Sequence, residues 1–420
     1  MRGRPAVWLL LACLGVTSGC AELRYVNTAP QITRHIRAND EPNQLIAFKT
    51  WVLYPGRDVL TLDWLWRRLG GDEAWNADTD FNAGTSFYTA RTEDELTPER
   101  LRHGPDVAPP QPPWRVVKPP RRGRPGTKFI AEDATGRRFL FKLDDPRYPE
   151  LGSSASVIAA RILWALGYNV PAVFVTRVEG TGDERLDGRR ATASLWLDGT
   201  IGHFRWDWFR YRREARALRM ACAWINHVDC GGRNAMVTVA DGLAHYVLID
   251  FDSCLGAWQG RPKEPWRGWQ HEGDPGWNLL RGLSLGLLHP EPDPRQPIVS
   301  PAIGRFDARF DPLAWRAQAP NTAFDHMTPA DLCWIADRIR RLDRPRIEAI
   351  VAAAELTEPA DADYLVETLL ARRQRILDLA AAAPQRGPAR PPRRPLGPRV
   401  VAAPREAGCS WRPVVVYCRD

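Results

Sequence analysis

The sequence predicts an α+β protein of two lobes, a small β-rich lobe followed by a larger and mostly helical one. Short β-type runs gather between residues 114 and 143, and helical periodicity dominates residues 328–381. Between these regions, residues 211–256 read as a helix, a polar loop and a β-hairpin. A chain of 420 residues is long enough to bury a core in each of two lobes.

Changes in composition along the chain suggest the domain boundaries. We expect six regions: a signal peptide (1–19), a tether (20–50), an N-terminal extension with a proline-rich linker (51–113), the small lobe (114–178), the large lobe (179–382) and a Pro/Arg-rich tail (383–420).

The N-terminus reads as an export signal, with basic residues before the short apolar core Ala6–Val16. This core is too short to span a bilayer as a mature helix. The run Val16–Cys20 resembles a bacterial lipoprotein processing site, although Thr17 stands where leucine is usual. Cleavage there would leave a lipid on Cys20. Ala21 lacks the aspartate that favours inner-membrane retention, so we expect an outer-membrane anchor facing the periplasm or cell surface; a plain secretory signal is the alternative.

Arginine carries the positive charge of this chain. The net charge is +8, and only five of the 58 basic residues are lysines. The charge is spread along the sequence, with its clearest excess near the C-terminus, and no basic helix is interleaved with aromatic residues. This pattern gives no support to nucleic-acid binding.

The cysteines suggest disulfides, since an exported protein folds under oxidising conditions. Cys409 and Cys418 would close a short terminal loop, and Cys230 and Cys254 are a second candidate pair because the hairpin brings their segments together. A zinc site is a further alternative, although no Cys-x-x-Cys spacing supports it. Its ligands would come from Cys222, His227, Cys230, His245 and Cys254.

The stretch 211–256 carries the candidate chemistry. A helix with an apolar stripe ends at Asn226-His227, and a glycine-containing loop leads to the β-type runs Ala235–Val239 and His245–Phe251. Asp229 and Asn234 lie on the loop.

Asp250 ends the second run, so the folded hairpin would bring it close to Asp229 and Asn234. Two carboxylates and an amide oxygen are hard ligands of the kind that Mg²⁺ prefers.

These residues resemble the catalytic core of the protein-kinase-like superfamily, whose pattern is His-x-Asp-x-x-x-x-Asn, a hairpin, and Asp-Phe-Gly. Here the pattern stands as His227-Val228-Asp229, Asn234 and Asp250-Phe251-Asp252. The resemblance implies that Asp229 accepts the proton of a substrate hydroxyl, with His227 as a second candidate catalytic residue. It also implies that Asn234 and Asp250 hold Mg²⁺, and that ATP or another nucleotide is the cofactor. Asp252 replaces the glycine and adds a carboxylate near the metal, so we expect it to be a further metal ligand.

The resemblance extends to the small lobe, where strands are expected at Trp114–Val117, Lys128–Glu132 and Arg138–Leu143. The loop with Gly123 and Gly126 would cover the nucleotide phosphates, although it matches the glycine-rich motif poorly. Lys142, a compact ammonium in an arginine-rich chain, would bind the phosphates from the third strand; a solvated edge-strand lysine is the alternative.

The helix expected at Ser153–Leu166 departs from the kinase pattern. Kinases place a glutamate here to hold the strand lysine. No acidic residue occurs between Ser153 and Gly167; Ser156 stands at the corresponding place, and Glu150 is a candidate substitute just upstream.

The remaining chain is expected to form aromatic-rich packed loops over 257–327 and closing helices from Thr328-Pro329 to Leu342, Arg344–Ala354 and Ala360–Ala381. Residues 78–381 also resemble an uncharacterised group of exported bacterial proteins with a kinase-like core. That resemblance implies a common fold and brings no activity with it.

Two functions follow from these features. The first is a phosphotransferase acting on an unknown protein or envelope substrate. The second is a catalytically inactive, pseudokinase-type binding module, favoured by the missing helix glutamate, by Asp252 and by export to a compartment poor in ATP. Transfer of another nucleotide-derived group and metal-dependent hydrolysis are weaker alternatives. The hydrolytic set would be Asp229, Asp250, Asp252 and His227.

Overall fold

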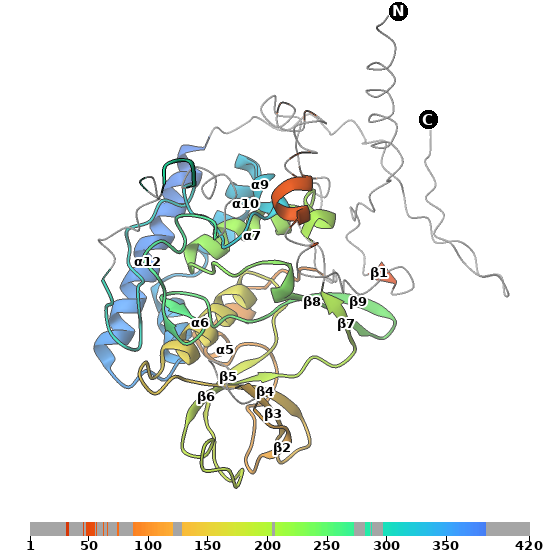
Figure 1. Ribbon diagram of the computed structural model, residues 1–420, viewed down its shortest axis with the longest axis vertical. Helices are drawn as coiled ribbons and strands as arrows, with labels where there is room; N and C mark the ends of the chain where they lie inside the picture. Colours follow the sequence, from red (N-terminus) through yellow and green to blue (C-terminus); the bar gives the residue numbers. More distant parts are fainter. Residues whose placement is uncertain are drawn as a thin grey trace, which may run out of the picture.

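The computed structural model shows a sheet lobe at one end of the molecule and a helical lobe above it (Figure 1). It describes residues 31–32, 45, 48–54, 56, 62, 65, 74, 87–120, 128–203, 206–272, 282–285, 287 and 297–383. The predicted signal peptide, Cys20, Gly123, Gly126, Cys409 and Cys418 lie outside these residues. Within them, no helix combines the length and apolar character needed to cross a membrane.

The small lobe is a five-stranded antiparallel sheet in the order β2-β3-β4-β6-β5. Its strands are β2 (Arg115–Lys118), β3 (Lys128–Glu132), β4 (Arg138–Leu143), β5 (Val173–Arg177) and β6 (Arg190–Leu195). Alternate residues of β3 and β4 point into one core, where the rings of Phe129 and Phe141 stack at 4.7 Å. The sheet therefore continues through β6, beyond the expected lobe boundary at residue 178.

Helix α6 (Leu151–Ala165) connects β4 to β5, and all 15 of its residues are buried. It begins two residues before the expected start because the Asp144 carboxylate accepts hydrogen bonds from the main-chain nitrogens of Glu150 and Ser153. The helix is followed by Gly167, whose φ of +101° is open to glycine. The helix thus lies inside the molecule between the two lobes (Figure 1).

Several helices of the large lobe pack against α7 (Arg213–Trp224), as Figure 1 shows. The other helices are α5 (Pro98–His103), α9 (Thr322–Asp325), α10 (Pro329–Arg340), α11 (Arg344–Ala352) and α12 (Pro359–Ala382). Thr97 caps α5, and Thr328 and Asp331 form a capping box at the start of α10. The start of α10 confirms the helix expected to begin at Thr328-Pro329.

A second sheet lies beside the helices in the order β1-β9-β8-β7. Its strands are β1 (Gln31–Ile32), β7 (Thr200–His203), β8 (Ala235–Ala240) and β9 (Leu243–Leu248). The pair β8–β9 is the hairpin expected from the sequence, closed by a turn in which Asp241 and Gly242 both have positive φ. A small two-stranded sheet, β10 (Ala257–Trp258) and β11 (Arg261–Pro262), follows the hairpin.

The described chain also contains short helices of other types. They are η2 (Lys49–Leu53), η3 (Asp94–Leu96), η4 (Trp206–Phe209) and η5 (Gly232–Asn234). Only η5 belongs to the candidate site, because it ends at Asn234 immediately before β8. The two-lobed α+β class, with a small β-rich lobe and a larger helical lobe, is confirmed.

Candidate functional site

The loop after α7 and the end of the hairpin meet as the sequence predicts. The main-chain nitrogen of Ile249 donates to the main-chain oxygen of Asn234 at 3.0 Å. Because Asp250 is the next residue, this bond fixes Asp250 close to the loop that carries Asp229. Asp250 has a φ of 64°, a left-handed conformation that is uncommon for a residue with a side chain.

Asn234 is oriented by the loop itself. Its amide nitrogen donates to the main-chain oxygen of Asp229. This bond uses the amide nitrogen, so Oδ1 is the side-chain atom available to a cation. Burial raises the pKa of the Asp229 carboxyl to about 6, and the neighbouring carboxylates of Asp250 and Asp252 act in the same direction. A carboxyl with this pKa is suited to taking a proton near neutral pH.

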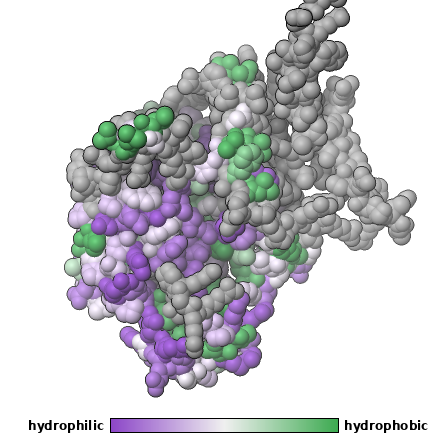
Figure 2. Space-filling model, in the orientation of Figure 1, coloured by the Kyte–Doolittle hydropathy of each residue, from purple (hydrophilic) through white to green (hydrophobic). Residues whose placement is uncertain are grey.

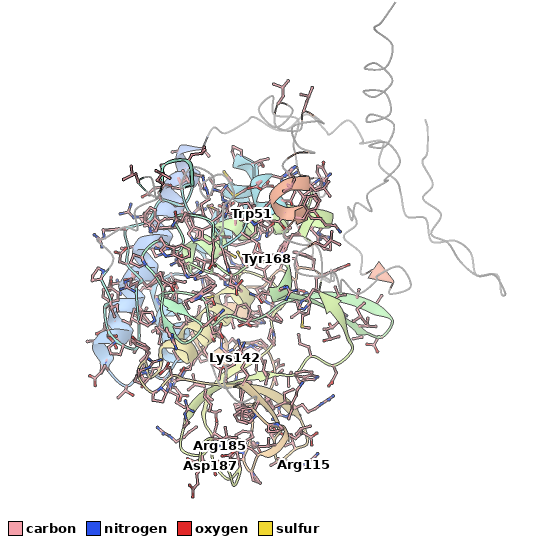
Figure 3. The ribbon with its side chains drawn as sticks, viewed as in Figure 1. Trp51, Arg115, Lys142, Tyr168, Arg185 and Asp187 are labelled. Atoms are coloured by element: carbon pink, nitrogen blue, oxygen red, sulfur yellow. The ribbon has the colours of Figure 1, made fainter. Side chains whose placement is uncertain are left out.

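Lys142 joins the small lobe to this loop. It lies on β4, between the sheet and the helical lobe (Figure 3), and its side chain is 13% exposed. Its ammonium lies 2.9 Å from Oδ2 of Asp252 and also donates to Oδ1 of Asp250. Because β4 lies inside the sheet and Lys142 contacts the acidic loop, the solvated edge-strand alternative is wrong. Binding of phosphates by Lys142 stays a prediction.

Lys128 is a second cation beside the acidic loop and was missed from the sequence. Its ammonium lies 3.5 Å from Oδ2 of Asp250, and the side chain is 45% exposed. Lys128 is the register partner of Lys142 on the adjacent strand, so the two side chains leave the sheet side by side. The rarity of lysine in this chain was the signal that could have found it.

The two lysines determine the charge of the acidic pair. Burial alone would raise the pKa of Asp250, but Lys142 and Lys128 hold it below its ordinary value. Burial raises the pKa of Asp252 against the pull of Lys142. Burial would lower the pKa of Lys142, but Asp252 and Asp250 raise it above its ordinary value. The site thus holds a charged lysine and an ionised Asp250.

His227 lies in the interior of the protein. It is 2% exposed, and its ring packs edge-on against Phe251 with centroids 5.8 Å apart. Burial lowers its pKa to about 3, so the ring is neutral. We therefore revise the predicted catalytic role of His227 to one of positioning Phe251, between the two acidic residues of the loop.

The segment after Asp252 is fastened to the end of α7. The Leu255 nitrogen donates to the Ile225 oxygen at 2.7 Å. The buried ammonium of Lys263 donates to the main-chain oxygens of Leu255 and Asn226. Lys263 also lay outside the sequence prediction, and it holds the two loops of the site together.

The cysteines near the site are free thiols. Cys222, Cys230 and Cys254 are buried and unbonded, so the expected Cys230–Cys254 bridge is wrong. Burial raises the pKa of the Cys222 and Cys254 thiols well above the ordinary value, which keeps them protonated. Across the described ranges, no group of three or more His, Cys, Asp or Glu side chains is arranged to hold a metal, so the zinc alternative finds no support there.

Helix α6 supplies no partner to Lys142. The hydroxyl of Ser156 donates to the Gly152 oxygen of its own helix at 2.8 Å. Glu150, the candidate substitute for the missing glutamate, accepts instead from the nitrogen and hydroxyl of Thr357. The suggestion that Glu150 replaces the helix acid is therefore wrong.

The chemistry of these side chains suits a divalent cation with a phosphate chain, while in this structure lysines occupy both carboxylate oxygens of Asp250. Asp250 and the Asn234 amide oxygen give few, hard ligands, and Mg²⁺ normally keeps its other positions for water and phosphate. Lys142 and Lys128 add two positive charges beside them.

Hydrophilic residues cover much of the described surface, including the small lobe, in the face shown in Figure 2.

Comparisons with known proteins give distant structural similarities. No family model and no curated protein sequence matches the chain. The Helicobacter pylori proinflammatory kinase CtkA is 14% identical, with 64% of this chain and 94% of that chain covered and a TM-score of 0.36. HipA, in a toxin–antitoxin complex with HipB and operator DNA from Shewanella oneidensis, is 10% identical, with 66% and 75% covered and a TM-score of 0.37.

A MAP kinase from Leishmania major, LmaMPK10, is 11% identical, with 65% of this chain and 82% of that chain covered and a TM-score of 0.24. These similarities are too distant to define the site, which is therefore characterised by its own contacts. Those contacts are a lysine of the small sheet paired with acidic residues that follow the hairpin of the large lobe.

Proposed function

We propose that the chain is a kinase-like phosphotransferase that uses a magnesium–nucleotide complex. The observation that carries this proposal is the ion pair between Lys142 and Asp250, which joins the two lobes across the cleft. Such a pair would place a lysine ammonium beside the nucleotide phosphates and a carboxylate beside the metal ion that those phosphates bind. Lys142 would bind phosphate oxygens, and Asp250 with Asn234 would hold the cation.

The acceptor in this proposal is a hydroxyl on a protein or envelope component. Asp229 lies on the loop between the end of α7 and η5, and its raised pKa suits a base that takes the hydroxyl proton. The bound Mg²⁺ would supply charge neutralisation on the phosphates. The chain's own residues would orient the acceptor, exclude water and receive the proton.

A binding module without chemistry is the second candidate. One observation favours it: both carboxylate oxygens of Asp250 accept from lysines in this structure. A cation can bind there only if Lys128 or Lys142 moves. In this alternative the lysines serve as permanent substitutes for the metal, and the two lobes form a closed recognition surface.

Calorimetry with Mg²⁺–ATP distinguishes the two candidates. The phosphotransferase proposal expects binding by the parent protein that is lost in Asp250→Asn and in Lys142→Ala. Lys118→Ala is the matched control, since Lys118 is an exposed lysine of the same sheet. No binding by the folded parent protein would support the binding module. If the parent protein does bind Mg²⁺–ATP, transfer of labelled phosphate to the protein itself or to a casein mixture is measured next.

We also propose that the protein is exported and lipid-anchored through Cys20 in a bacterial outer membrane. The signal-like sequence and the small residues before Cys20 support this localisation. Metabolic labelling with an alkyne fatty acid in a Gram-negative host is the test. Labelling that disappears in Cys20→Ser is expected; unlabelled, processed protein in the medium would instead indicate a plain secretory signal.

A further inference from the structure

In the kinase pattern the strand lysine is held by an acidic residue of the helix that corresponds to α6. The serine hydroxyls of α6 are all engaged elsewhere. The Ser153 hydroxyl donates to Asp144 at 2.6 Å, and the Ser154 hydroxyl lies 3.4 Å from the Ala302 oxygen. With Ser156 bonded to its own helix, α6 has no group that could hold an ammonium.

Helix α6 is also fixed in place. Glu150, just before its start, is bonded to Thr357, and Arg190 of the neighbouring strand donates to the main-chain oxygens of Ala354 and Glu355 in the large lobe. Since every residue of the helix is buried, swinging it outward would expose apolar surface along its whole length. A moving helix therefore cannot be what positions the lysine.

Asp252 is in the right place to do so. Its Oδ2 lies 2.9 Å from the Lys142 ammonium, and its side chain is only 15% exposed. The loop that carries it is fastened to the end of α7 through Leu255. The ion pair therefore rests on a fixed support in the large lobe, and it connects that lobe directly to β4.

The geometry points to a division of tasks within the acidic loop: Asp252 is the positioning residue that holds Lys142, and Asp250 is the cation ligand. Asp252, which stands in place of the usual glycine, would thus hold Lys142 as the missing helix glutamate does in kinases. The site would form without any movement of α6. This inference deepens the proposed function and rests on it. It also revises the sequence expectation that Asp252 is a metal ligand.

Competitive labelling of the lysines with acetic anhydride tests this inference without nucleotide. The chain has only five lysines, so mass spectrometry can follow each one, and exposed Lys118 is the internal reference. In Asp252→Asn, labelling of Lys142 relative to Lys118 should rise about tenfold or more at fixed pH, because losing one ion-pair partner lowers a lysine pKa by about one unit. Asp252→Glu keeps the charge and should label within about twofold of the parent protein.

Binding of Mn²⁺ to the same variants separates a lysine partner from a metal ligand. We expect Asp250→Asn to weaken Mn²⁺ binding by about tenfold or more and Asp252→Asn to change it by less than about threefold, since removing a charged ligand costs more than removing a neighbour. Equal losses in both variants, or unchanged Lys142 labelling in Asp252→Asn, would overturn the inference.

These outcomes are distinguishable from failure of the proposed function. If the parent protein binds no nucleotide, the phosphotransferase proposal fails, while the labelling of Lys142 still decides whether Asp252 holds it. Circular dichroism checks that each variant is folded. Should Asp252→Asn not fold, Asp252→Ser is the second neutral variant, with the same expected rise in labelling.

Discussion

Lys263 and Asn226 form a buried hydrogen bond, from an ammonium to a main-chain oxygen, that ties the end of α7 to the chain beyond the acidic loop. Lys263 is 1% exposed, and its second acceptor is the Leu255 oxygen. Asn226 and Leu255 both have left-handed φ values, 48° and 47°. The ammonium therefore stabilises two strained turns on either side of the candidate site.

Replacing Lys263 by methionine should destabilise the protein. The change leaves the Asn226 oxygen without this donor, and a buried unpaired carbonyl costs about 1–3 kcal/mol. Urea unfolding followed by tryptophan fluorescence measures the loss. Lys118→Met is the matched control and should change the free energy of unfolding by less than about 0.5 kcal/mol, as for most exposed positions. Equal stability of Lys263→Met and the parent protein would contradict this role.

The same lysine predicts how stability depends on pH. Burial lowers the pKa of Lys263 to about 7 from an ordinary value of 10.5. Between these values the unfolded chain binds a proton on Lys263 that the folded chain does not, so the free energy of unfolding rises with pH over this window. The deficit of Lys263→Met should therefore be larger at pH 9 than at pH 6.5. A deficit that shrinks as pH rises would contradict this.

Lys128 should contribute to nucleotide binding through its charge. It is half-exposed beside Asp250, so Lys128→Ala should weaken Mg²⁺–ATP binding by about two- to fivefold, the range of exposed ion pairs. The effect should fade in 0.5 M salt, where the Debye length is only a few ångströms. Calorimetry at two salt concentrations measures both effects, and Lys118→Ala should show neither. A salt-independent loss would indicate a structural role instead.

The ionisation of Asp229 should determine how phosphate-transfer activity falls at low pH. Its carboxyl must be ionised to accept a proton, and its pKa is about 6. The value of kcat/KM should therefore rise as pH increases through 6 and level off above 7. Asp229→Asn should lower kcat by about 10²-fold or more, as expected for loss of a general base. Asp241→Asn, in the exposed hairpin turn, should leave the profile unchanged; a flat profile in the parent protein would contradict the assignment.

Arg372 should be a major contributor to stability in the large lobe. It is 2% exposed and donates to the main-chain oxygens of Ala223 and Trp224 at the end of α7. Its guanidinium also lies 3.7 Å from the ring centroid of Phe310. Arg372→Ala should lower the free energy of unfolding by about 2–4 kcal/mol, because two buried carbonyls lose a donor.

The control for Arg372 is Arg375→Ala, an exposed arginine on the same helix. It should change the free energy of unfolding by less than about 0.5 kcal/mol. Thermal unfolding of both variants at one pH makes the comparison, and similar midpoints would show that Arg372 does not stabilise the end of α7.

Much of the fold could be predicted from local sequence signals. Thr97 and Thr328 mark helix starts because a hydroxyl before a proline satisfies the first main-chain nitrogens of a helix. The β8–β9 hairpin follows from its turn residues, and β3 and β4 from alternation of apolar side chains. By contrast, β6 was assigned to the wrong side of the lobe boundary, because its pairing with β4 and β5 joins residues distant in the sequence.

The candidate site was predicted in part. Asp229, Asn234 and Asp250 follow one another along a loop and a hairpin, so their spacing reveals that they meet. Lys128 and Lys263 were missed because nothing near them in the sequence indicates what they contact. Cys230 and Cys254 were expected to pair, but they are buried as free thiols.

By itself the sequence determined which elements form and in what order, because caps, turns and apolar periodicity act over a few residues. It also supplied the set of acidic and amide groups on one loop and hairpin. Only the tertiary structure decided which cation meets which carboxylate. Lys142 is separated from Asp250 and Asp252 by 108 and 110 residues, and such pairs form only when the packing of two lobes brings their surfaces together.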